Sequence, residues 1–155
     1  MVKQSAPKEE LVLLDMKEIL RRHAACRSQV EAILRKMLDE FTKAWSRGDI
    51  EVACECYGEA AIYISRSGGI VMEGKKYIID RYHETYPDAA TRGVLKLDII
   101  DFQMGLFFKD DLPTTVTTNL RWTISREGEE DKIGPCLEVY QMDENGKYYV
   151  VLDAS

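Results

Sequence analysis

Apolar residues recur at helical spacing in the first third of the chain, which has neither glycine nor proline between residues 8 and 47. One broad apolar stripe, with charged residues opposite, is formed by Val30, Ile33, Leu34, Met37, Leu38, Phe41, Ala44 and Trp45. A second stripe lies upstream, at Val12, Leu13, Met16, Ile19 and Leu20. Between the stripes, Ser28 is followed three residues later by Glu31, which fits a capping box that starts a new helix. The pattern favours two helices, although one continuous helix satisfies the same residues.

Short elements separated by turn residues follow. Gly48 ends the long helical region, and Asp49 is placed to cap the next helix. Gly68 and Gly69 mark a turn, and Pro87 ends a later helix. The pattern predicts, in order, a short helix over residues 50–56, a strand over 62–65, an apolar run over 70–72 and a helix over 74–86.

The rest of the chain alternates apolar and polar residues, as strands do. The apolar phase slips within one strand, from Leu95, Leu97 and Ile99 to Ile100, Phe102 and Met104. A β-bulge causes such a slip, and a bulge bends a sheet. Further strands are predicted over residues 115–125, 137–142 and 148–152. We therefore predict an α+β fold in which N-terminal helices pack against a curved antiparallel sheet, with a pocket at its open end.

Composition and charge narrow the possible functions. The chain has 155 residues and a formal net charge of -6, which disfavours nucleic acid and anionic membranes as partners. No apolar stretch is long enough for a signal segment or a bilayer span. The four cysteines are predicted to be reduced structural thiols, and Cys54 and Cys56 point to different sides of a helix. We expect a cytoplasmic protein with no metal and no cofactor.

Several short segments, in this order, resemble the nuclear transport factor 2-like superfamily: residues 41–50 with 56–61, residues 70–75, and residues 139–148. The resemblance covers residues 29–155 and is greatest to the ketosteroid isomerase-like and polyketide-cyclase-like (SnoaL-like) branch. It implies a cone-shaped domain over residues 28–155, preceded by an extension helix within residues 1–27. It also implies a homodimer, since members of the superfamily commonly dimerise.

The resemblance allows a test of steroid isomerase chemistry, which uses a carboxylate base, with a tyrosine and a protonated carboxylic acid at the enolate oxygen. The tyrosine position falls on Phe41, which has no hydroxyl, and the base position falls on Ser65. An unassisted serine does not abstract a proton near neutral pH. The supporting tyrosines fall on Tyr57 and Tyr82, and the second acid falls on Glu138. The resemblance thus implies a retained pocket without steroid isomerase activity.

Glu138 is the candidate catalytic residue, as a general acid or base oriented by Tyr57 and Tyr82. If Glu138 points inward, burial raises its pKa; the alternative is a solvent-facing glutamate, and alternation does not decide between them. The expected pocket residues are Tyr57, Tyr63, Ser65, Tyr82, Trp122 and Tyr140. Trp122 also fits plain core packing. His83 is expected at the surface, and His23 has no assigned role.

Two functions remain open. The first is a pocket protein for a small lipophilic ligand, either a binder or an enzyme of unassigned reaction. The second is a non-catalytic association or oligomerisation module, which the extra amphipathic helix and the incomplete catalytic set favour. In the second case the pocket is vestigial and Glu138 is exposed.

Overall fold

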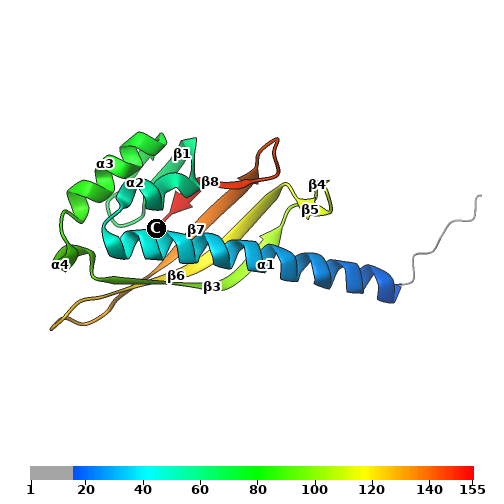
Figure 1. Cartoon of the computed structure of the whole chain (residues 1–155), viewed down its shortest axis with the longest axis horizontal. Helices are drawn as coiled ribbons and strands as arrows, with labels where there is room; N and C mark the ends of the chain where they lie inside the picture. The colour runs from blue at the N-terminus through cyan, green and yellow to red at the C-terminus, as the bar shows by residue number, and fades with distance from the viewer. Residues whose placement is uncertain (1–15) are drawn as a thin grey trace, which may run out of the picture.

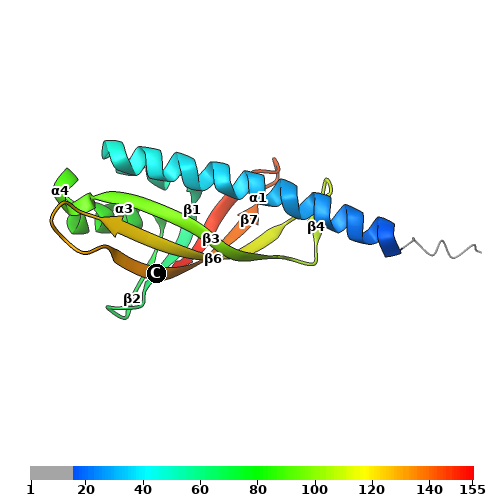
Figure 2. The same cartoon turned by 90° about the horizontal axis from the view of Figure 1, so that it is seen from below.

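A computed structural model describes residues 16–155. One long helix, α1 (Met16–Arg47), lies across a curved sheet and projects beyond it at its N-terminal end (Figures 1 and 2). The prediction of two helices is wrong, because α1 continues through Ser28 without a break. Glu31 does not cap a helix; it pairs with Arg35 one turn later, at 2.7 Å. The part of the predicted extension helix before Met16 lies outside the described residues.

The remaining elements are short helices and strands. They are α2 (Ile50–Ala53), the 3₁₀ turn η1 (Cys54–Cys56), β1 (Tyr57–Ser65), β2 (Ile70–Glu73), α3 (Lys75–Thr85), α4 (Ala89–Arg92), β3 (Val94–Met104), β4 (Phe108–Lys109), β5 (Leu112–Pro113), β6 (Thr115–Ser125), β7 (Lys132–Met142) and β8 (Tyr148–Ala154). The predicted helix over 50–56 is therefore a helix and a 3₁₀ turn. Asp49 does not cap α2, because its carboxylate accepts a hydrogen bond from Arg47 instead.

Six strands form one sheet in the order β2-β1-β8-β7-β6-β3. All neighbours are antiparallel except β1 and β8, which run parallel. The sheet is therefore mixed, where the sequence pattern predicted an antiparallel one. The parallel pair brings the C-terminal strand beside the first strand, between β1 and β7 (Figure 1).

The predicted bulge in β3 is confirmed. The register of β3 against β6 shifts between Ile99 and Asp101. Ile100 is consequently 59% exposed, whereas Phe102, in the new phase, is 2% exposed. The extra residue thus turns the second half of β3 so that Phe102 joins the core.

The core lies between the sheet and the C-terminal half of α1. Val30, Leu34 and Trp45 are buried there, together with Val116 and Tyr140 from the sheet. The N-terminal turns of α1 extend past the sheet, and its apolar residues Met16, Ile19 and Leu20 are exposed. The first turns of α1 therefore lie outside the core.

Candidate functional site

A cavity of about 270 Å³ lies between the sheet and the helices α1 and α3. Seven of its lining residues are aromatic: Phe41, Trp45, Tyr57, Tyr63, Tyr82, Tyr86 and Trp122. Several rings contact one another edge to face, among them Trp45 and Tyr86, whose centroids are 4.9 Å apart. Both tryptophans of the chain line this cavity. The aromatic part of the wall thus holds its rings in fixed relative orientations.

Trp122 reaches the cavity because of a glycine on the neighbouring strand. Gly134 on β7 pairs with Trp122 on β6. A Cβ atom at Gly134 would come within 2.3 Å of the Trp122 indole. The missing side chain therefore lets the indole lie across β7, where it joins the cavity wall.

Most of the residues predicted from the sequence lie at this cavity. Tyr57, Tyr63, Ser65, Tyr82 and Trp122 all line it, and so does Glu138. Tyr140 is not part of the lining; it is 1% exposed, in the core, and its hydroxyl donates a hydrogen bond to Glu138 Oε2. Tyr140 therefore acts on the cavity through Glu138. Phe41 also lines the cavity, without a hydroxyl to offer.

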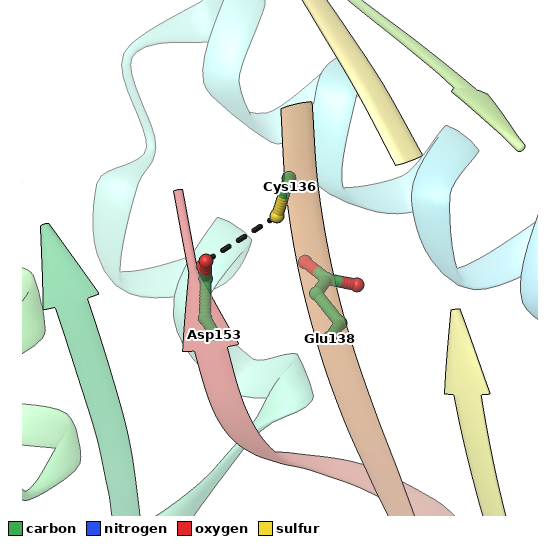
Figure 3. Close-up of side chains that lie close together, drawn as sticks. All are labelled: Cys136, Glu138 and Asp153. Atoms are coloured by element: carbon green, nitrogen blue, oxygen red, sulfur yellow. Dashed lines mark hydrogen bonds between the residues drawn. The ribbon is translucent and has the colours of Figure 1, made fainter. Parts of the chain in front are cut away.

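Two buried acids belong to the polar part of the cavity, which also includes Ser65, Ser67, Arg81, Thr85 and Ser155. Glu138 on β7 and Asp153 on β8 are direct cross-strand neighbours, 8% and 3% exposed. Cys136 precedes Glu138 by two residues, so its side chain lies on the same face of the sheet (Figure 3). The Cys136 thiol donates a hydrogen bond to Asp153 Oδ1, at 3.3 Å. Glu138 therefore does not stand alone.

Burial sets the protonation of this acid pair. Desolvation, and then the charge of Asp153, raise the pKa of Glu138 to about 8, against the opposing hydrogen bond from Tyr140. Desolvation also raises the pKa of Asp153, while hydrogen bonds from Tyr57 and Cys136 oppose the rise. A pKa of about 8 leaves Glu138 protonated at neutral pH and lies in the range where acid–base catalysts work.

Tyrosines hold each acid in place, but not in the predicted combination. Tyr57 donates a hydrogen bond to Asp153 Oδ2 at 2.5 Å, and its hydroxyl lies 3.1 Å from that of Tyr82. The prediction that Tyr57 and Tyr82 orient Glu138 is wrong. These two tyrosines support Asp153, because β8 pairs with β1, which carries Tyr57, and Glu138 lies one strand further away. Burial raises the pKa of both tyrosines, so both remain neutral donors.

Asp153 is a candidate site residue that the sequence pattern missed. The strand was predicted to end at Leu152, and alternation from Tyr148 and Val150 places Leu152 inward. In the structure Tyr140 pairs with Val150 and Val139 pairs with Leu152, so β8 carries an extra residue at that point. The bulge reverses the phase and turns Asp153 inward. The signal in the sequence that could have found Asp153 was a carboxylate directly after a predicted apolar strand.

Comparison with known proteins gives the fold. No family model matches the chain, and no curated protein matches it. A solved structure of an NTF-2 like protein of unknown function from Shewanella oneidensis MR-1 superposes with a TM-score of 0.67 at 21% identity, covering 80% of this chain and 96% of the other. The chain has a nuclear transport factor 2-like (NTF2-like) fold.

Two further structures agree. An NTF2-like protein of unknown function from Pseudomonas putida KT2440 has a TM-score of 0.64 at 10% identity, covering 82% of this chain and 85% of its own. An NTF2-like protein with a cystatin-like fold from Novosphingobium aromaticivorans has a TM-score of 0.61 at 14% identity, covering 92% and 89%. At these identities the likeness shows the NTF2-like fold and nothing about activity.

Of the other residues considered from the sequence, Cys136 lies at the acids of the NTF2-like cavity and His83 does not. His83 is exposed on α3, and its Nε2 lies 2.8 Å from a Glu51 oxygen. The four cysteines are free thiols, as predicted. None of the described helices has the length and apolar character needed to cross a bilayer.

Cys136, Glu138 and Asp153 are also the residues that could hold a metal in this NTF2-like domain. One ligand atom from each lies within 4.8 Å of the others. Thiolates and carboxylates bind metal only when deprotonated, and burial raises the pKa of all three groups. A metal ion would therefore have to displace protons, and the absence of a metal stays a prediction.

Proposed function

We propose that this protein binds a small, mostly apolar molecule in the cavity, with a polar group of that molecule against Glu138 and Asp153. The observation that carries the proposal is a cavity with aromatic walls and two buried acids in its lining. An apolar pocket with a few convergent polar groups of perturbed pKa is the usual form of a small-molecule site.

The cavity volume limits the ligand. Pockets for drug-sized ligands typically measure about 300–1,000 Å³, and this cavity measures about 270 Å³. A ligand below drug size fits, whereas a long lipid chain does not. Apolar area removed from water supplies affinity at roughly 25 cal/mol per Å², and the acids supply orientation.

If the bound molecule also reacts, Glu138 is the general acid or base. Its pKa of about 8 keeps it protonated at neutral pH, so it can donate a proton and then recover one. Asp153 keeps that pKa high through its charge, and Tyr140 positions the carboxyl group. Tyr57 positions the carboxyl group of Asp153, and the Tyr82 hydroxyl lies against that of Tyr57.

A ligand screen tests the proposal. Small hydrophobic compounds are titrated while tryptophan fluorescence and melting temperature are recorded, since both tryptophans line the cavity. A compound that binds the native state raises the melting temperature by mass action.

Thr85→Phe, at a residue that lines the cavity from the exposed C-terminal end of α3, should weaken these responses. Glu84→Phe is the matched control, because Glu84 is its exposed neighbour and is not part of the lining. The proposal fails if no compound changes either signal, or if both variants respond alike.

A second candidate function, association with another protein or another copy, is favoured by the opposite end of the molecule. Leu106 and Phe107 are 91% and 80% exposed in the segment between β3 and β4. Phe108 shares an open groove with Cys26 and Arg22 of α1. Light scattering tests association with another copy: a wild-type oligomer that dissociates in Leu106→Ser/Phe107→Ser supports it, and a monomeric wild-type protein contradicts it.

A further inference from the structure

The acids of the cavity have neutral hydrogen-bond donors but no cationic partner. Asp153 accepts from Tyr57 and Cys136, and Glu138 accepts from Tyr140. None of the ion pairs within residues 16–155 includes Glu138 or Asp153. Buried charges are ordinarily paired, so two unpaired acids at a cavity are an unusual arrangement.

The pair presents two buried carboxyl groups side by side. Desolvation, and then the charge of Asp153, raise the pKa of Glu138, whereas hydrogen bonds from Tyr57 and Cys136 oppose the rise in the pKa of Asp153. One oxygen of Glu138, Oε2, accepts from Tyr140; within residues 16–155 no hydrogen bond reaches the other oxygen, Oε1. A ligand therefore meets an acidic site with an unused acceptor.

Two arginines act on the cavity groups from its edge. Arg81 of α3 belongs to the lining, and its charge opposes the raised pKa of Tyr63. Arg66 is exposed, and its charge opposes the raised pKa of Cys136. Neither charge outweighs desolvation, which is the first cause of the raised pKa in both cases. Among residues 16–155, neither arginine forms an ion pair with Glu138 or Asp153.

The rest of the wall also suits a cation. The faces of tyrosine and tryptophan rings attract organic cations, and clustered aromatic rings recognise substituted ammonium groups. Trp45 and Tyr82 are 5.5 Å apart between ring centroids, and Tyr63 and Tyr82 are 6.2 Å apart. All three rings line the cavity that the acids share.

We propose that the ligand is an organic ammonium ion with apolar substituents, its positive charge held by Glu138 and Asp153 and its substituents packed among the aromatic rings. This assignment rests on the proposed small-molecule function and names its ligand class. An ammonium ligand differs from a neutral ligand in one respect: the cation pairs with the buried acids, whereas a neutral molecule leaves them without a cationic partner.

Proton release is the consequence that can be measured. A bound cation stabilises the ionised form of Glu138, so binding below the pKa of this group must displace its proton. For a quaternary ammonium ion, which does not titrate, affinity rises by up to about tenfold per pH unit below the pKa of about 8 and levels off above it. The titratable groups that act on Glu138 or on which it acts are Asp153 from β8, Tyr140 and Cys136 from β7, Tyr57 from β1 and Cys56 from η1.

Choline and 3,3-dimethylbutan-1-ol form a suitable probe pair. They have the same shape, and they differ in having a cationic nitrogen or a neutral carbon at the branched centre. Both are titrated into the protein from pH 6 to pH 9 while tryptophan fluorescence is recorded. We expect choline to bind more tightly, on the order of tenfold above pH 8, with proton release below that pH.

Glu138→Gln isolates the role of the acid. The amide has nearly the same shape and still accepts from Tyr140, so choline should lose its pH dependence and most of its advantage over the alcohol. Glu130→Gln is the control, because it makes the same change in net charge at an exposed position away from the cavity. Asp153→Asn repeats the test if Glu138→Gln does not fold.

Each outcome separates this inference from the function on which it rests. Equal binding of the two probes, or tighter binding of the alcohol, overturns the ammonium assignment and leaves the cavity as a site for neutral molecules. Binding of neither probe also overturns the assignment. If the hydrophobic compounds fail as well, the proposed small-molecule function falls with it.

Discussion

The carboxyl groups inside the cavity and those on the outer surface have pKa values shifted in opposite directions. Desolvation raises the pKa of Glu138 to about 8 and raises that of Asp153. At the surface, hydrogen bonds from Arg21 and Arg22 lower the pKa of Glu18 to about 2. The chemical group is the same, and access to water decides the sign of the shift.

The comparison shows that the carboxyl groups that lower the stability of the fold lie in the cavity. Surface carboxylates such as Asp101, which accepts from Arg27 at 2.8 Å, are solvated and paired. Glu138 and Asp153 are neither, although a hydrophobic pair of the same size would fill the site at less cost. Groups that lower the stability of a fold are common at binding and catalytic sites. The proposed function is therefore placed at the cavity and not at the surface.

The largest expected effect is on the pH dependence of stability. A folded-state pKa raised from 4.5 to about 8 stabilises the fold below pH 4.5, and this contribution is lost as pH rises through 8. Wild-type protein should therefore lose a few kcal/mol of unfolding free energy between about pH 5 and pH 8. Glu138→Gln should have a flatter profile and exceed the wild type at pH 8 in urea unfolding. Parallel profiles for the two proteins would show that Glu138 is not desolvated.

A smaller effect is expected from the tyrosine that supports Asp153. Tyr57→Phe removes a buried donor and leaves the acid under-satisfied, at a cost of about 1–3 kcal/mol. Tyr63→Phe is the matched control: its hydroxyl lies 3.3 Å from the Ser155 hydroxyl, is only partly buried, and should cost less than about 1 kcal/mol. Chemical denaturation at pH 7 measures both. Equal losses would contradict the assigned role of Tyr57.

The smallest effect is expected at the surface. Glu18→Gln removes the partner of Arg21 and Arg22 in the exposed first turns of α1. Exposed ion pairs contribute little and are screened by salt, so the melting temperature should stay within error of the wild type at physiological ionic strength. A clear loss of stability that persists in high salt would mean that this end of α1 is packed in solution.

Prediction from the sequence succeeded where the structure depends on residues that are close together in the sequence. The strand periods and the bulge after Ile99 followed from local alternation, because side chains on a strand alternate faces with period two. The same reasoning failed at Ser28, where a capping box fits the sequence yet α1 continues. The helix-forming residues on both sides, with ion pairs such as Glu31 to Arg35, favour continuation over a cap. The prediction that Asp49 caps the next helix failed for a similar reason, since Arg47 competes for its carboxylate.

By itself, the sequence determined the α+β class, most of the element order and the aromatic character of the future cavity wall, because each depends on composition and short-range periodicity. Only the tertiary structure decided that Glu138 faces inward beside Asp153, that Tyr57 supports the second acid, and that β1 runs parallel to β8. These features depend on the register of strands distant in sequence and on one extra residue in β8. A shift of one residue there turns Asp153 from the cavity to the solvent, and no local pattern encodes that choice.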